Sequence, residues 1–297
     1  MKPLHLELQI RKHSLEEFKN LTVQILHYLP NIISGTVQKG KYDISVSEIA
    51  GTKKYVRPIN RSLFINDPDQ FTESYNNLLP IFERIRNHET LFSTTEKQII
   101  DSTLYTVQQA IGAGLDLLVA QNSARKHVGN RFEELIATVF ETLGVTSCKM
   151  VLQIPYETDE GTKVYKCEND LILSPYAEMK SNQALLDENE IVLSVKTTSK
   201  DRMGKMFIDK ILLEKFVRHP QKVIGVFLND VQRKEGGNIS YTLVSGLFMV
   251  YTQFLTQLEG IYYLDPPPVT SKEPYNRYIK RFADLITDDL RILLPSQ

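Results

Sequence analysis

Cysteine, long apolar runs and an excess of one charge are all scarce in this sequence, and the first two absences each exclude a class of protein. Two cysteines, Cys148 and Cys167, are too few for a disulfide framework or a four-thiolate metal site. Both lie in apolar, strand-like stretches, which is typical of ordinary buried thiols. No apolar run reaches the roughly 18 residues that cross a bilayer, and the first residues lack the apolar segment of a signal peptide. We therefore expect a cytoplasmic protein with no membrane partner.

The charges nearly cancel, since 35 basic and 36 acidic side chains give a formal net charge of −1. This balance does not exclude a nucleic-acid partner, because binding depends on where cations cluster. Basic residues gather between positions 196 and 222, although a solvated helix face would explain this stretch equally well. The sequence also has no glycine-rich phosphate loop and no HxxxH spacing. ATP dependence is therefore not expected.

The first part of the chain, residues 1–122, is predicted to be mostly helical. Ser14-Leu15-Glu16-Glu17 forms a capping-box pattern for a helix that runs to about residue 28. Further helices are predicted over 70–87 and 94–120. Glycines among β-branched residues between 30 and 66 predict short strands or loops. We expect this region to contact DNA, to form a dimer interface, or to do both.

The second part, residues 123–297, is predicted to form an α/β core. A first helix carries residues 129–144. The elements predicted after it are strands at 149–155, 164–173 and 190–198, a helix at 203–217, a buried strand at 223–228, a helix at 243–258, a strand at 261–264 and a helical stretch at 273–294. This order predicts a central mixed β-sheet flanked by helices.

Three charged residues of this core form a pattern with a chemical meaning. Asp170 lies within a predicted strand, where aspartate is a poor strand former and needs a reason to be present. Ser194 and Lys196 end a later strand, and the alternation of side chains places both on one face of the sheet. Asp209 follows 13 residues after Lys196, in the next predicted helix.

Hydrolysis of a phosphodiester needs these residue types. A carboxylate can hold Mg²⁺, which neutralises charge in the transition state and lowers the pKa of a bound water. A lysine beside the metal can orient that water and stabilise negative charge near the scissile phosphate. A second carboxylate from a neighbouring element completes such a site.

The pattern resembles the PD-(D/E)xK nucleases, and among them the type II restriction endonucleases of the EcoRII, SsoII and NgoMIV group. In that group a serine stands two positions before the lysine, and the second acid lies in the following helix. Ser194, Lys196 and Asp209 are similar to this arrangement. The stretch Gly129-Asn130-Arg131-Phe132-Glu133 resembles the group's Gly-x-x-Phe-Glu element. The resemblance covers about residues 125–265 and does not extend to the N-terminal third.

The resemblance implies a restriction-endonuclease-like core and a role for each of these residues. The implied roles are Mg²⁺ binding for Asp170 and Asp209, positioning of the attacking water for Lys196, support of the metal site for Glu133, and the displaced-acid position for Ser194. Two residues depart from the group's pattern. Asn169 replaces the usual proline, and Asp209 replaces the usual glutamate, so its reach to the metal is one methylene shorter.

Each residue also has a plainer explanation. Asp170 could be a strand-end turn residue, and Lys196 could be an edge-strand lysine with its stem buried and its amine in water. Asp209 could pair with Lys205 on the helix surface, and Glu133 could form a surface salt bridge. The joint order and spacing of the residues favour the nuclease interpretation.

A short charged segment after the lysine predicts how DNA is read. In the resembled group, a motif at this position reads CC:GG base pairs, and Lys200-Asp201-Arg202 stands there. Arginine or lysine donates to guanine O6 and N7, while aspartate accepts from the cytosine amine. A local ion triplet at a strand–helix junction is the alternative. Other candidate phosphate contacts are Lys39, Lys41, Lys53, Lys54, Lys205 and Lys210.

The sequence therefore predicts a Mg²⁺-dependent type II restriction endonuclease that cuts double-stranded DNA at a site containing CCGG, or CC and GG with a spacer. A palindromic target calls for a symmetric protein, so a homodimer or a dimer of dimers is expected. The alternatives are a structure-selective or repair nuclease without base specificity, and a non-catalytic DNA-binding protein with a degenerate nuclease fold.

Overall fold

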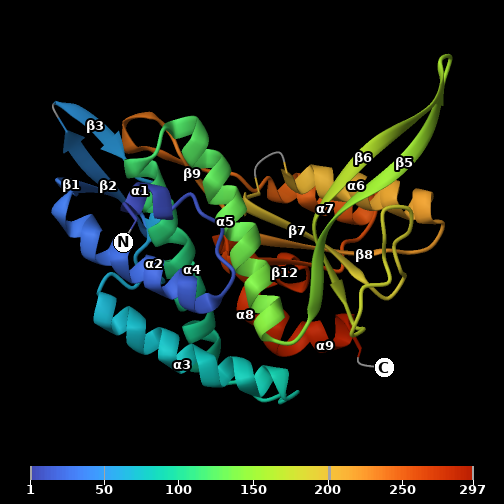
Figure 1. The fold of residues 1–297 in the computed structure, drawn as a ribbon, viewed down its shortest axis with the longest axis horizontal. Helices are drawn as coiled ribbons and strands as arrows, with labels where there is room; N and C mark the ends of the chain where they lie inside the picture. The colour runs from blue at the N-terminus through green and yellow to red at the C-terminus, as the bar shows by residue number, and fades with distance from the viewer. Residues whose placement is uncertain (1, 50, 200–201, 296–297) are drawn as a thin grey trace.

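A computed structural model describes residues 2–49, 51–199 and 202–295, and shows an α/β protein with one large central sheet (Figure 1). The strands of this sheet are β5 (Thr146–Thr158), β6 (Gly161–Ser174), β7 (Ile191–Thr198), β8 (Lys222–Asn229), β11 (Gly260–Asp265) and β12 (Ile279–Arg281). Their spatial order is β12-β11-β8-β7-β6-β5. Pairing is antiparallel from β5 to β7 and parallel from β7 to β12, so the predicted mixed sheet is confirmed.

Helices cover both faces of the sheet, and the alternation along β7 shows why. Leu193 and Val195 are buried in one core cluster with α4 (Thr94–Leu118) and α5 (Gln121–Thr142). Val192, on the other face, is buried in a second cluster with α6 (Arg202–Val217) and α7 (Ser245–Phe254). A strand with apolar residues on both faces is typical of a sheet packed between two helical layers.

The N-terminal region packs around the long helix α4, which is buried from Ile100 to Leu115. The helices around it are α1 (Leu4–Glu7), α2 (Leu15–Tyr28), α3 (Pro68–Arg86) and α5, with the 3₁₀ turn Leu29–Asn31 after α2. The predicted cap of α2 is confirmed, because Ser14 Oγ accepts a hydrogen bond from the Glu17 amide at 3.2 Å. None of the described helices is long and apolar enough to span a membrane.

The stretch predicted as short strands or loops forms a small antiparallel sheet. Its strands are β1 (Gly35–Lys39), β2 (Tyr42–Ile49), β3 (Thr52–Tyr55) and β4 (Ile59–Asn60). Strand β2 pairs with each of the other three. A further two-stranded ribbon after the central strand β8 consists of β9 (Val231–Arg233) and β10 (Ile239–Tyr241), joined by the 3₁₀ turn Glu235–Gly237.

The prediction of one helical stretch over 273–294 is wrong in its first half. After the 3₁₀ turns Pro268–Ser271 and Tyr275–Arg277, the chain forms strand β12, and only then the helical run of α8 (Phe282–Asp284), the π-turn Leu285–Asp289 and α9 (Leu290–Leu293). Ile279 is buried in the core beside β11, so sheet pairing outweighs local helix preference there.

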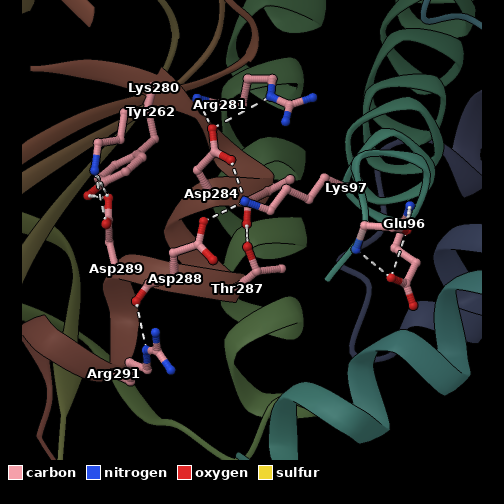
Figure 2. A network of polar contacts seen from close by, with 12 residues as sticks. Glu96, Lys97, Tyr262, Lys280, Arg281, Asp284, Thr287, Asp288, Asp289 and Arg291 are labelled. Carbon is pink, nitrogen blue, oxygen red and sulfur yellow. Dashed lines mark hydrogen bonds and ion pairs between the residues drawn. The ribbon is translucent and has the colours of Figure 1, made fainter. Parts of the chain in front are cut away.

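Ion pairs dock this C-terminal run on α4 (Figure 2). The Lys97 ammonium lies 2.9 Å from Asp284 Oδ1 and 2.5 Å from Asp288 Oδ2. On the adjacent strand, Lys280 pairs with Asp289 at 2.7 Å, and the same carboxylate accepts a hydrogen bond from Tyr262 Oη at 2.8 Å. The C-terminal run is thereby joined to α4 through polar contacts as well as through the core.

Candidate active site

The backbone around Asp170 is irregular on both sides, and this sets its direction. Strand β6 pairs with β7 only from Leu171 to Leu173, so the ladder stops immediately before Asp170. On the other edge, the register with β5 shifts so that Lys149 alone faces both Asp170 and Leu171. Such bulges re-aim side chains and often lie next to active sites. The bulge explains how an aspartate can occupy this strand.

The carboxylate of Asp170 accepts a β7 amide in place of a backbone carbonyl of β6. Its Oδ2 accepts the Val195 amide at 2.9 Å and lies 3.4 Å from Ser194 Oγ. The Lys196 ammonium forms an ion pair with the same oxygen. In the part of the chain that the structure describes, all of the hydrogen bonds to Asp170 end on Oδ2, so Oδ1 has no protein donor there. The structure therefore brings Asp170, Ser194 and Lys196 together.

Helix α5 presents two adjacent glutamates to different surroundings, because successive helical residues point about 100° apart. Glu134 faces the N-terminal region, where it pairs with Arg131 at 2.6 Å and accepts the Lys12 amide at 3.1 Å. Glu133 instead lines a cleft beside Lys196, and its Oε2 lies 3.0 Å from the Lys149 ammonium. Glu133 thus stands near the Asp170 site, paired with a lysine from β5.

Asp209 lies on α6, which packs on the sheet face that carries Val192. Its carboxylate pairs with Lys205 one turn earlier, at 2.5 Å. No hydrogen bond or ion pair among the described residues joins Asp209 to Asp170 or Lys196. The structure therefore does not bring Asp209 into contact with Asp170 or Lys196, and its role as a metal ligand stays a prediction.

A cleft of about 790 Å³ opens at the carboxyl ends of β7 and β8. In sheets with parallel strands, ligands bind at this edge. The walls come from these strand ends, from the first half of α5 and from β3 with the segment after it. Its basic lining residues are Lys53, Lys54, Arg57, Arg125, Lys196, Arg202 and Arg233. Asp116 and Glu133 are the acids of the described lining, so the cleft is positive and suited to a polyanion.

Sequence reasoning missed three of these cations, Arg57, Arg125 and Arg233. They come from distant parts of the chain, and the fold brings them to one cleft. Arg57 is also held in place, because Asp116 on α4 accepts from its Nε and Nη2 at 3.0 Å each. The Arg57 guanidinium lies so close to Gly112 that a Cβ there would be 2.3 Å from Cζ.

Four of the six candidate phosphate contacts divide into two groups, which either line the cleft or pair with an acid elsewhere. Lys53 and Lys54 line the cleft. Lys210 is buried and pairs with Glu259 at 2.5 Å, so its assignment to phosphate is wrong: the sequence could not show that this helix turn faces the core. Lys41 pairs with the buried Asp265 at 2.7 Å.

The residue before the segment proposed to read bases, Ser199, is held by hydrogen bonds. Ser199 is buried, and its Oγ lies 3.0 Å from Asp230 Oδ1 and 2.8 Å from Thr242 Oγ1. Lys200 and Asp201 lie outside the described residues. Arg202, the third member of the predicted motif, begins α6 and lines the cleft.

The donor atoms around Asp170 fit a hard divalent cation with few protein ligands. No group of three or more acids, histidines or cysteines suited to a metal occurs within residues 2–49, 51–199 and 202–295. Mg²⁺ does not need one, because it keeps several waters and is usually bound through one or two carboxylates and substrate phosphates. Asp170, whose Oδ1 accepts no hydrogen bond from the described residues, and Glu133, which pairs with Lys149, are carboxylates of this kind.

Comparison with known proteins identifies the fold. Neither a family profile nor a curated protein matches the sequence. The structure is similar to the type IIP restriction endonuclease Kpn2I, with a TM-score of 0.70 and 17% identity over 95% of this chain and 92% of that one. Weaker likenesses are to the restriction endonuclease PspGI in complex with substrate DNA (TM-score 0.39, 11% identity, 76% and 93% covered) and to BbvCI (TM-score 0.33, 13% identity, 75% and 87% covered). The chain has the fold of a type II restriction endonuclease, as its motifs predict.

Proposed function

We propose that this protein is a Mg²⁺-dependent type II restriction endonuclease that cleaves double-stranded DNA. The observation that carries the proposal is the contact between Asp170 and Lys196 beside a basic cleft at the carboxyl ends of β7 and β8. A carboxylate with one open oxygen, a neighbouring ammonium and a positive groove are the parts that phosphodiester hydrolysis needs. The likeness of the whole fold to Kpn2I supports the same conclusion.

The residues have separate tasks in this mechanism. Asp170 would hold Mg²⁺, with Asp209 or Glu133 as the second acid. The ion, when bound, supplies charge neutralisation at the scissile phosphate and acidifies a bound water. Lys196 is held by Asp170 and can orient the attacking water with its ammonium. Ser194, 3.4 Å from Asp170, keeps the carboxylate in place. Attack of the water on phosphorus, in line with the departing O3′ atom, breaks the P–O3′ bond and leaves 5′-phosphate and 3′-hydroxyl ends.

The remaining cations of the cleft suit the DNA backbone. Lys53, Lys54 and Arg57 belong to the N-terminal region, residues 1–122, and line the cleft opposite the core. This supports a DNA-contacting role for that region, and residues 123–297 would then carry the chemistry. Contacts of this kind supply salt-dependent affinity without sequence information.

Sequence reading is assigned to Lys200, Asp201 and Arg202, and the target to a site that contains CCGG or CC and GG with a spacer. The support is the donor–acceptor chemistry of these side chains and the position of Arg202 on the cleft. A palindromic site presents two equivalent strands, so the active form is proposed to be a homodimer or a dimer of dimers.

Digestion of unmethylated plasmid DNA of known sequence tests the proposal. Discrete fragments in Mg²⁺, and intact DNA in excess EDTA, are the expected result. A smear instead of bands would support a nuclease without base specificity. Intact DNA over a range of salt, together with DNA binding, would contradict cleavage and leave a DNA-binding protein.

A further inference from the structure

Lys149 is a charged residue of the site that the resemblance does not include. The register shift between β5 and β6 places it alone opposite Asp170 and Leu171. Its ammonium lies 3.0 Å from Glu133 Oε2, and its side chain is 59% exposed. A long, exposed side chain at a strand irregularity is free to change direction, since its four-carbon stem has several rotamers.

The charges of the site alternate in sign across four elements. Glu133 comes from α5, Lys149 from β5, Asp170 from β6 and Lys196 from β7. Partial burial of the Lys149 ammonium lowers its pKa, but the hydrogen bond to Glu133 and the charges of Glu133, Asp170 and Glu168 outweigh it, so the pKa is raised. The Lys149 ammonium pairs with Glu133, and its backbone stands opposite Asp170, so it belongs to the same charge cluster as both candidate metal-binding carboxylates.

We propose that Lys149 takes the place of the divalent cation in the metal-free protein and swings to a DNA phosphate when the cation binds. This inference rests on the proposed nuclease function. A doubly charged ion at Asp170 and Glu133 repels the ammonium and competes for the same oxygens. The displaced side chain, which is 59% exposed, is then free to pair with a phosphate of bound DNA. Lys149 is thus a positioning residue that links metal binding to DNA binding.

This role predicts effects of opposite sign on two affinities. Loss of the ammonium removes a competitor, so the metal should bind more tightly in the absence of DNA. The same loss removes a phosphate contact, so DNA should bind more weakly once the metal is present. A side chain that only supports the fold would weaken both.

Mn²⁺ binding without DNA, followed by electron paramagnetic resonance of the free ion, measures the first effect. Lys149→Met is expected to lower the dissociation constant about 3–10-fold, because site affinity follows the local charge count. Lys149→Arg keeps the charge and should stay within about 2-fold of wild type. Lys163→Met, which removes a lysine paired with Glu160 farther out on the same hairpin, is the matched control and should change nothing.

A duplex with the mapped cleavage site, in Ca²⁺ in place of Mg²⁺, measures the second effect. Lys149→Met is expected to weaken binding several-fold and to reduce the salt slope by about one contact. An unchanged or weaker Mn²⁺ affinity for Lys149→Met would overturn this inference alone. Absence of Mn²⁺ binding by every variant, wild type included, would overturn the proposed metal dependence with it.

Discussion

Two groups of charged residues in this protein use the same types of side chain for different purposes. The C-terminal network of Lys97, Asp284 and Asp288 joins α4 to the last helical run (Figure 2). The second group consists of Glu133, Lys149, Asp170 and Lys196, of which Glu133 and Lys196 line the cleft, and it spans α5 and three strands of the sheet. Both alternate acid and base, so charge pattern alone does not distinguish them.

The difference lies in what each acid has left to bind. In the network, burial opposes the charge of Asp284, but the hydrogen bond from Lys97, the charge of Arg281 and the Arg281 amide hold its pKa below the ordinary value. Its carboxylate is occupied on several sides by protein donors. Among the described residues, the hydrogen bonds to Asp170 all end on one oxygen, and the other receives none. An ion pair that leaves an acceptor open beside a cleft is the more informative sign of a reactive site.

Lys196→Met should produce the largest effect. Loss of the ammonium removes a positioned positive charge at the reacting phosphate, so cleavage should fall by about 10²–10³-fold or more. The cleft keeps its other cations, so binding of a target duplex in Ca²⁺ should change little. Single-turnover cleavage and a filter-binding assay measure the two. Equal cleavage by wild type and variant would remove Lys196 from the chemistry.

Lys97→Met should have the reverse profile. The Lys97 side chain is 16% exposed and serves two carboxylates, so its loss leaves Asp284 and Asp288 without their shared cation. We expect the free energy of unfolding to fall by about 1–3 kcal/mol. Cleavage per folded molecule should be unchanged. Urea unfolding gives the first quantity, and loss of activity without loss of stability would contradict the division between the two groups.

Asp101 in α4, beside the C-terminal network, makes the stability of the protein depend on pH. Burial raises its pKa to about 8, against a hydrogen bond from the Ala283 amide and the charge of Arg281, whose Nε lies 3.9 Å away. The neighbouring charges of Asp284 and Lys97 act on it with opposite signs. Above the ordinary aspartate pKa of 3.8, the unfolded chain has released this proton, whereas the folded state still holds it. The free energy of unfolding should therefore fall as pH rises from about 4 to about 8.

Asp101→Asn should remove this part of the pH dependence, since an amide does not titrate and still accepts the Ala283 amide. The free energy of unfolding of the variant should exceed that of wild type by about 1–3 kcal/mol at pH 8, and the two values should lie closer together near pH 4. Urea unfolding at several pH values measures the difference. A gap that does not grow with pH would show that Asp101 is not the group responsible.

Gly112→Ala should produce the smallest effect of these substitutions. The new Cβ would meet the Arg57 guanidinium at 2.3 Å and push it away from Asp116. We expect DNA affinity to fall a few-fold and the free energy of unfolding to fall by about 1 kcal/mol. Gly246→Ala is the control, because nothing lies within 4 Å of that position. Similar losses in both variants would attribute the effect to helix substitution in general.

Much of this architecture follows from local sequence, and the rest depends on distant contacts. The cap of α2 and the strands of the core agree with predictions from residue type and alternation. The sequence pattern also singled out Asp170, Ser194 and Lys196, which the structure places in contact. The bulge at Asp170 leaves no signal in the sequence, because it depends on the register between two strands. Lys149 enters the site only through that bulge. Arg57 reaches the cleft through its pair with Asp116, 59 residues away.

Sequencing the ends of fragments from unmethylated DNA, cut by wild type and by Lys196→Met in parallel, tests the central claim most directly. The account predicts that wild-type ends fall at one repeated site that contains CCGG or CC and GG, with 5′-phosphates, and that the variant yields almost none. Ends scattered without a common sequence, or equal numbers from both proteins, would contradict it.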